Sequence, residues 1–139
     1  MAAAATFDPR DFTVLLVNSD QHARGELGSQ LRRGGYQTRD FERAIDLLAA
    51  PSHIFRWSCV LSELSLPDMT SVDLVRNLRD RAIRIPVIVL TGQADVRTAV
   101  EALRNDVSDF LVKPVAEHDL LQRIETALAR YVGQAQAVL

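Results

Sequence analysis

The chain has 139 residues, 47% of them hydrophobic and 24% charged, which is typical of one globular domain with a sizeable core. Its 16 Lys and Arg residues against 18 Asp and Glu give a net charge of −2, so we expect no nucleic-acid binding by this domain. The longest apolar runs are far below the roughly 20 residues that span a bilayer, and the N-terminus lacks the pattern of a secretory signal. The single cysteine, Cys59, allows no intrachain disulfide, and we expect a cytoplasmic protein without membrane contact.

The first two predicted elements are a strand and a helix. Phe12–Val17 is a continuous β-prone run, as expected of a strand that is covered on both faces. Asp20 is a candidate N-cap, and apolar residues then recur every four positions from Ala23 to Leu31. The pair Gly34-Gly35 predicts the end of this helix.

The same alternation continues to the C-terminus. Further strands are predicted at Tyr36–Asp40, Trp57–Ser62, Ile85–Leu90 and Asp109–Val112. Apolar stripes at helical spacing predict helices at Phe41–Ala50, around Val72–Leu78, around Val96–Leu103 and around Leu120–Val132. We interpret the stripes of the last two helices as core contacts. Strands that alternate with helices predict right-handed crossovers and a three-layer α/β domain with a parallel sheet.

Polar residues follow several of the predicted strands. Asn18 and Ser19 come after the first strand, Glu63 after the third, Thr91 after the fourth and Lys113 after the fifth. In an open parallel sheet, ligands bind beyond the carboxyl ends of the strands. A carboxylate, a hydroxyl and an ammonium group at this edge suit an anion or phosphoryl site. The alternative is that these strand ends are polar because they meet water.

Three motifs give the chain a family resemblance: Leu64–Thr70 (LSLPDMT), Ile85–Gly92 (IPVIVLTG) and Asp109–Pro114 (DFLVKP). Their order and spacing resemble the receiver domain of two-component response regulators, the CheY-like superfamily. The resemblance implies a single-domain, doubly wound α/β fold, with a five-stranded parallel sheet of order 2-1-3-4-5 and five helices. We expect an N-terminal extension over residues 1–11, the receiver domain over 12–132 and a C-terminal tail over 133–139.

The resemblance also implies site roles. In the family, an aspartate that ends the third strand accepts a phosphoryl group from a histidine kinase, and an acidic pair after the first strand helps to hold Mg²⁺. By position, Thr91 and Lys113 correspond to the phosphate-binding hydroxyl and lysine, and Phe110 to the switch aromatic. Pro114 also matches, and the family's Lys–Pro bond is commonly cis.

The residues for the chemistry itself depart from the family pattern. Glu63 stands at the phosphoacceptor position, Asn18 and Ser19 stand where the acidic pair is expected, and Ser71 replaces a usual glycine. Glu63 alone supplies negative charge, and Lys113 cancels it, so we predict weak or absent Mg²⁺ binding, no other cofactor and no enzymatic activity. Asn18 and Ser19 are alternatively helix-capping residues. The resemblance thus implies an atypical, pseudo-receiver domain.

Two interpretations of Glu63 stay open. Its carboxylate mimics the phosphorylated state through Thr91 and Lys113, or it pairs with Lys113 only to close an unused pocket. In both cases we predict a response regulator that acts through protein contacts with a sensor histidine kinase. The family also implies a possible homodimer through the fourth helix, the fifth strand and the last helix.

Other functions are less well supported by the residues. The chain is alternatively a receiver that a histidine kinase still phosphorylates, on Glu63 or on Asp68, although an aspartate after Pro67 more often shapes a turn. A flavodoxin-like binder of a cofactor or small anion is a third possibility. It would lack a glycine-rich phosphate loop, because Gly34-Gly35 only end a helix.

Overall fold

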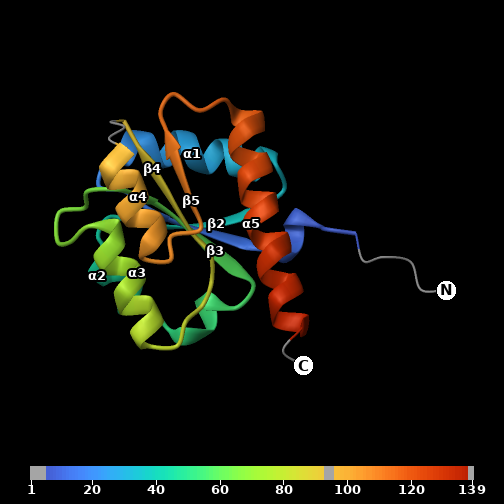
Figure 1. The fold of residues 1–139 in the computed structure, drawn as a ribbon. Helices are drawn as coiled ribbons and strands as arrows, with labels where there is room; N and C mark the ends of the chain where they lie inside the picture. The colour runs from blue at the N-terminus through green and yellow to red at the C-terminus, as the bar shows by residue number, and fades with distance from the viewer. Residues whose placement is uncertain (1–5, 93–95, 138–139) are drawn as a thin grey trace.

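A five-stranded parallel sheet forms the centre of the molecule (Figure 1). The computed structural model describes residues 6–92 and 96–137. The strands are β1 (Thr13–Val17), β2 (Gln37–Phe41), β3 (Ser58–Glu63), β4 (Val87–Thr91) and β5 (Asp109–Val112). Their order is β2-β1-β3-β4-β5, and every neighbouring pair is parallel. The predicted sheet and its strand order are therefore confirmed.

Five α-helices cover the two faces of this sheet. They are α1 (Gln21–Arg33), α2 (Ala44–Leu48), α3 (Ser71–Asp80), α4 (Val96–Arg104) and α5 (Glu117–Ala137), and two short 3-10 helices lie at Pro9–Asp11 and Ser52–Phe55. Figure 1 shows α2, α3 and α4 on one side of the sheet and α5 on the other. No helix among the described residues is both long and apolar enough to cross a bilayer.

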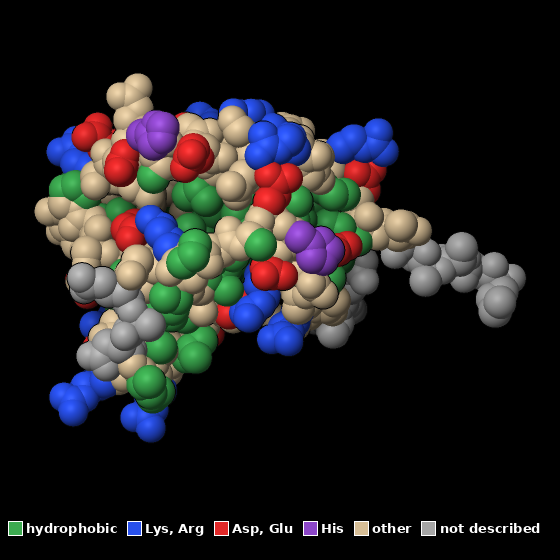
Figure 2. Space-filling view, turned by 90° about the horizontal axis from the view of Figure 1, so that it is seen from above, with side chains coloured by type: hydrophobic (Ala, Val, Ile, Leu, Met, Phe, Trp, Pro, Cys, Tyr) green, Lys and Arg blue, Asp and Glu red, His purple; other side chains and the backbone are tan. Residues whose placement is uncertain are grey.

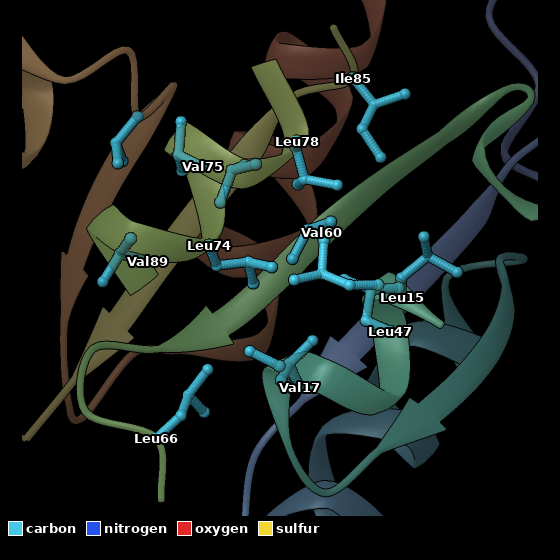
Figure 3. Close-up of a cluster of buried hydrophobic side chains, with 14 of the residues drawn as sticks. Leu15, Val17, Leu47, Val60, Leu66, Leu74, Val75, Leu78, Ile85 and Val89 are labelled. Atoms are coloured by element: carbon cyan, nitrogen blue, oxygen red, sulfur yellow. The ribbon is translucent and has the colours of Figure 1, made fainter. Parts of the chain in front are cut away.

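Successive strand residues point to opposite faces, so each strand feeds two hydrophobic clusters. Leu15 and Val17 pack with α2 and α3 in the cluster of Figure 3, while Val14 and Leu16 pack with α1 and α5 on the other face. All four side chains are almost completely buried. Burying each Leu or Val contributes about 1.5–3 kcal/mol. A sheet covered on both faces explains why the central strands are apolar throughout.

The ends of α1 agree with their sequence signals. The carboxylate of Asp20 accepts hydrogen bonds from the backbone N–H groups of His22 and Ala23, which caps the helix. Gly34 is the C-cap residue, and Gly35 has a φ of 97°. Since residues with a side chain rarely adopt that conformation, the second glycine allows the chain to leave the helix and enter β2.

The second helix is shorter than the predicted span over residues 41–50. Phe41 is the last residue of β2, where it pairs with Val17. Strand pairing therefore outweighs the helical spacing of this apolar residue. The helix begins only at Ala44, and Ile45, part of the predicted apolar stripe, is exposed.

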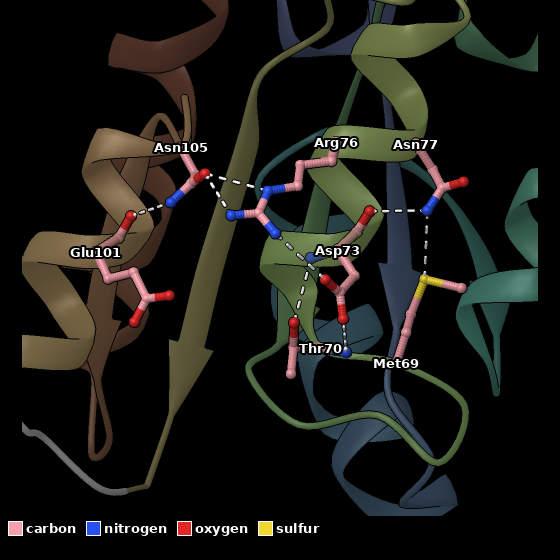
Figure 4. Close-up of polar contacts among 7 residues, drawn as sticks. All are labelled: Met69, Thr70, Asp73, Arg76, Asn77, Glu101 and Asn105. Carbon is pink, nitrogen blue, oxygen red and sulfur yellow. Dashed lines mark hydrogen bonds and ion pairs between the residues drawn. The ribbon is translucent and has the colours of Figure 1, made fainter.

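The interpretation of the apolar residues of the helix around Val96–Leu103 as core contacts is wrong. Val96, Val100 and Leu103 are 79%, 41% and 51% exposed, and Ala102 is the buried residue of this helix. At about 100° per residue, Ala102 lies on the side of the helix opposite Val100. The C-terminal end of α4 is joined to α3 by polar contacts, in which the guanidinium of Arg76 donates to Asn105 Oδ1 at 2.9 and 3.2 Å (Figure 4). A small residue and polar bonds hold α4, so its bulky apolar face is left outside.

The last helix is longer than predicted. Leu120, Ile124 and Leu128 are buried as expected, but α5 does not end at Val132 and continues to Ala137. Gly133 lies within the helix, although glycine costs about 1 kcal/mol there relative to alanine. The residues that follow it in α5, 134–137, are glutamines and alanines, which favour helix and offset this cost.

Candidate functional site

The strand register brings the predicted site residues to one edge of the sheet. Val17 is paired with Ser62, so Asn18 and Glu63 follow as neighbours at the carboxyl ends of β1 and β3. On the other side, Glu63 pairs with Leu90 of β4, and the backbone N–H of Lys113 donates to Thr91 O at 2.8 Å. Asn18, Glu63, Thr91 and Lys113 therefore share the carboxyl edge of β1, β3, β4 and β5.

An ion pair lies at the centre of this edge. Lys113 Nζ donates to Glu63 Oε2 at 2.9 Å, and the two side chains are 37% and 22% exposed. Thr91 is buried beside them, at 6% exposure. One negative and one positive charge cancel here. A pair this accessible to water contributes up to about 1 kcal/mol.

The segment after β1 is occupied by local hydrogen bonds. The side-chain oxygen of buried Asn18 accepts the backbone N–H of Asp20 at 2.8 Å, and Ser19 is exposed. The residue that caps α1 is Asp20, and neither Asn18 nor Ser19 does so. The alternative in which Asn18 and Ser19 cap the helix is therefore wrong. The hydrogen bond from the backbone N–H of Asp20 to Asn18 forms a turn that places Asp20 at the start of the helix.

Arg24 was not anticipated from the sequence. Its Nη1 donates to the carbonyl oxygen of Asn18, and its Nε is buried without a hydrogen-bond partner among the described residues. This guanidinium adds positive charge at the carboxyl end of β1. Its position one helical turn after the cap residue Asp20 could have indicated this contact, because helical side chains point back toward the N-terminus of the helix.

The remaining predicted site residues lie on β5 and directly after it. Phe110 is half-buried and packs against the cluster between the sheet and α2–α4. The Lys113–Pro114 peptide bond is cis, as the family resemblance implies. Among the described residues, no three His, Cys, Asp or Glu side chains gather in a group that could hold a metal ion.

Asp68 joins the loop after β3 to the start of α2. Its two carboxylate oxygens accept the backbone N–H groups of Ala44 at 3.1 Å and of Ile45 at 2.8 Å. Desolvation acts to raise the pKa of Asp68, but these hydrogen bonds outweigh it and hold the pKa below its ordinary value of 3.8. The carboxylate therefore has a structural partner 23 and 24 residues away, which no local pattern indicates.

We expect Asp68→Ala to lower the free energy of unfolding at pH 7 by about 1 kcal/mol, the usual cost of losing a helix cap. Because the folded pKa is depressed, the carboxylate stabilises the protein fully above pH 4 or so, and this contribution disappears as the pH falls through the folded value. Urea unfolding at several pH values measures the difference. Asp40→Ala, at an exposed strand position, is the control. A pH-independent difference would contradict the role of the charge.

The start of α3 carries a capping box and a buried hydroxyl. Thr70 Oγ1 accepts the backbone N–H of Asp73, whose carboxylate accepts the N–H of Thr70 (Figure 4). Ser71, which stands where the resembling family usually has glycine, is completely buried. Its Oγ has no hydrogen-bond partner among the described residues.

Ser71→Ala is expected to raise the free energy of unfolding by about 1 kcal/mol, because burying a hydroxyl without a partner costs about 1–3 kcal/mol. Ser71→Gly is the matched comparison, and it should be less stable than the alanine variant, since glycine disfavours helix. Urea unfolding of the three proteins decides the order. A destabilised alanine variant would show that the hydroxyl has a partner.

The single cysteine, Cys59, lies in a hydrophobic core cluster. The residue is completely buried within β3, and burial raises the pKa of its thiol to about 12. A thiol with so high a pKa forms little thiolate at neutral pH. Cys59 therefore belongs to the core and not to the candidate site.

Comparisons with known proteins agree with this geometry. The family model described as "Response regulator receiver domain" matches residues 14–125, most of the chain. The transcriptional regulatory protein FixJ of Rhizobium meliloti is 36% identical over 123 residues, which cover 88% of this chain. The chain belongs to the response regulator receiver family. The receiver domain is also similar to the cell cycle transcriptional regulator CtrA of Caulobacter vibrioides, with 30% identity over 129 residues and 91% of the chain.

Solved structures of receiver domains share the fold. The crystal structure of FixJ-N superposes with a TM-score of 0.79 at 35% identity, covering 86% of this chain and 94% of that one. The low-resolution structure of the response regulator StyR gives a TM-score of 0.80 at 27% identity, covering 91% of this chain and 64% of that one. The match spans 60% of the length of FixJ and 54% of CtrA. The similarity thus concerns the receiver part of these longer regulators.

Proposed function

We propose that this receiver domain signals through protein contacts without Mg²⁺-dependent phosphorylation, with Glu63 in place of the phosphoacceptor aspartate. The observation that carries the proposal is the 2.9 Å contact between Glu63 and Lys113. The carboxylate at the end of β3 already accepts a hydrogen bond from Lys113, the residue that, by family resemblance, binds the phosphoryl group. The partners are a sensor histidine kinase and a second copy of the chain.

The charges at the carboxyl edge support weak Mg²⁺ binding. Mg²⁺ requires octahedral oxygen ligands and is usually bound through carboxylates. Glu63 is paired with Lys113, the oxygen of Asn18 accepts a backbone N–H, and Arg24 contacts the end of β1. These residues do not fit a Mg²⁺ site, because the two cations offset the available negative charge.

The contact between Glu63 and Lys113 biases the domain toward the active conformation without locking it. Taking a two-state switch from 1:99 to 99:1 requires about 5.5 kcal/mol. A hydrogen bond to a charged group contributes roughly 1.5–3 kcal/mol when shielded, and less here, where both partners meet water. The rest of the 5.5 kcal/mol must come from binding a partner. The fraction of the domain in the active conformation therefore depends on the concentration of that partner.

Phosphorylation is tested with wild-type protein, Mg²⁺ and phosphoramidate as the donor. We expect no added phosphoryl mass on the intact protein and no saturable chemical-shift change at Asn18 or Glu63 when Mg²⁺ is titrated. Phosphorylation of either Glu63 or Asp68, located by mass spectrometry, would overturn the proposal. A saturating Mg²⁺ response at these residues would overturn it as well.

Glu63→Gln separates mimicry from simple closure of the pocket. If the charged pair favours the associating conformation, the association constant of the dimer should fall by up to about thirtyfold, because a pair this exposed contributes up to about 1 kcal/mol in each of the two copies. Sedimentation equilibrium measures the change, and Lys113→Met together with the double variant completes a cycle. If the association constant of the dimer is unchanged in all three variants, the pair is only a structural contact and mimicry is refuted.

The surface proposed for self-association is the apolar face of α4 with the adjoining end of β5. We call it the α4 stripe, defined as Val96, Val100, Leu103 and Val112. All four side chains are at least 40% exposed. Figure 2, seen from above, shows hydrophobic side chains gathered at the lower left, on the side where α4 lies. Contiguous exposed apolar residues mark interaction sites more often than isolated ones do.

Charges of both signs surround the α4 stripe. Glu101 and Arg104 are exposed on α4, and Asp109 of β5 is paired with Arg123 of α5 at 2.6 Å. A two-fold interface brings the same patch of each copy together, so it needs both signs of charge around an apolar centre. The α4 stripe and its surroundings meet this requirement, which supports a second copy as its occupant.

A further inference from the structure

A cavity lies at the opposite end of the sheet from Glu63. It has a volume of about 550 Å³, within the range of about 300–1,000 Å³ that is common for small-molecule pockets. One wall is α5, which contributes residues three and four positions apart, among them Arg123, Thr126 and Arg130. The other wall is formed by the segments that enter β4 and β5, including Arg84 and Ser108.

Arg79 connects the two segments that lead into β4 and β5. Its Nε donates to Asp106 Oδ2 at 2.7 Å, and its Nη1 donates to the carbonyl oxygen of Ile83, also at 2.7 Å. The side chain is only 16% exposed. Both segments contain a residue in the left-handed region, Ala82 with φ 61° and Asp106 with φ 72°. Such residues cost about 1–2 kcal/mol each and are often found where a site requires a particular backbone shape.

The charges of this cavity do not balance. Asp106 is paired with Arg79. Both carboxylate oxygens of Asp109 accept hydrogen bonds from Arg123 Nη1, at 2.7 Å for Oδ1 and 2.6 Å for Oδ2. Arg84 and Arg130 also line the cavity, and within residues 6–92 and 96–137 they have no carboxylate partner. Four arginines against two aspartates leave two positive charges, although the whole chain has a net charge of −2.

We propose that this cavity binds a small molecule that carries a phosphate monoester. Two unpaired guanidinium groups match the two negative charges of such a group, and the planar fork of arginine binds phosphate oxygens in pairs. Ser108 Oγ accepts the backbone N–H of Val87 at 3.2 Å, which leaves its proton for a ligand oxygen. The volume accommodates an organic portion beside the phosphate, and Tyr131 is among the residues that line the cavity.

The site lies at the amino ends of β4 and β5 and shares no residue with the Glu63 edge. Asp109 and Arg123 also lie beside the α4 stripe, so ligand binding is measured separately from self-association. Adenosine 5′-monophosphate, inorganic phosphate and adenosine are the probes, titrated into the ¹⁵N-labelled 139-residue chain. We expect the nucleotide to shift the amide signals of Ser108 and Asp109 in a saturable way. Inorganic phosphate should compete at higher concentration, and adenosine should cause no shift.

Variants test the two arginines directly. We expect Arg84→Gln and Arg130→Gln together to weaken nucleotide binding at least tenfold. Arg39→Gln together with Arg32→Gln, on β2 and on α1 beside it at the opposite edge of the sheet, is the control that removes the same two charges and should leave binding unchanged. Equal weakening by the control would mean non-specific attraction and overturn the proposal. So would no saturable shift with millimolar nucleotide, equal binding of adenosine, or binding of a poly-glutamate peptide but not of the nucleotide.

Discussion

Replacing Asn18, Ser19 and Glu63 together by aspartate is expected to raise the Mg²⁺ affinity by about a hundredfold or more. The variant adds two carboxylates at the carboxyl edge of β1 and shortens the one at the end of β3. A pair of unit charges 4 Å apart gains roughly 4 kcal/mol at an effective dielectric constant of 20, and a divalent cation gains more. Even after the cost of removing water from Mg²⁺, two added carboxylates should exceed the roughly 2.7 kcal/mol that a hundredfold change requires. Isothermal titration calorimetry measures the affinity.

Two controls separate local from general charge effects. Gln37→Asp with Ser52→Asp adds the same two charges at exposed positions near the amino ends of the strands, and Mg²⁺ should bind this variant no better than the wild type. Asn18→Asp with Ser19→Asp retains Glu63 and tests the effect of its length. If the triple variant stays as inert toward Mg²⁺ and phosphoramidate as the wild type, missing carboxylates are not what limits the chemistry.

Changing Val100 and Leu103 to aspartate should weaken self-association by more than about a hundredfold. Each buried Val or Leu contributes about 1.5–3 kcal/mol, and a two-fold interface uses both residues twice. The added carboxylates also repel their copies in the partner. Sedimentation equilibrium over a range of concentrations gives the dimerisation constant of the wild type and of the variant.

Ile45→Asp is the matched control for this interface. Ile45 is 47% exposed, close to the 41% and 51% of Val100 and Leu103, but it lies on α2 outside the α4 stripe. Its replacement should leave the dimerisation constant unchanged. A wild-type protein that remains monomeric at several hundred micromolar, or a control as damaging as the double variant, would refute self-association through the α4 stripe.

The strands could be predicted from the sequence because the sheet is buried on both faces. Continuous apolar runs then coincide with strands, and the prediction for Asp109–Val112 agrees with β5 residue for residue. The strand order came from the family motifs and not from periodicity. Helix α1 was also predictable, since Asp20 and Gly35 act through the local backbone.

Contacts between distant segments could not be predicted in this way. The bond from Asp68 to the start of α2 and the bond from Arg76 to Asn105 join residues more than 20 positions apart. An amphipathic helix has one apolar face, but its sequence does not say whether a sheet or another protein covers that face. The apolar face of α4 is therefore predicted to lie in the core, whereas Ala102 packs there.

The ion pair at the end of β3 also has a consequence in time. A phosphoryl group on an aspartate is lost by hydrolysis, so an ordinary switch returns to rest at the rate of that reaction. The carboxylate of Glu63 belongs to the polypeptide itself and cannot be hydrolysed away. Under the proposed function, the signal therefore has no chemical lifetime. It lasts as long as the molecule, and only synthesis, degradation or a competing partner can end it.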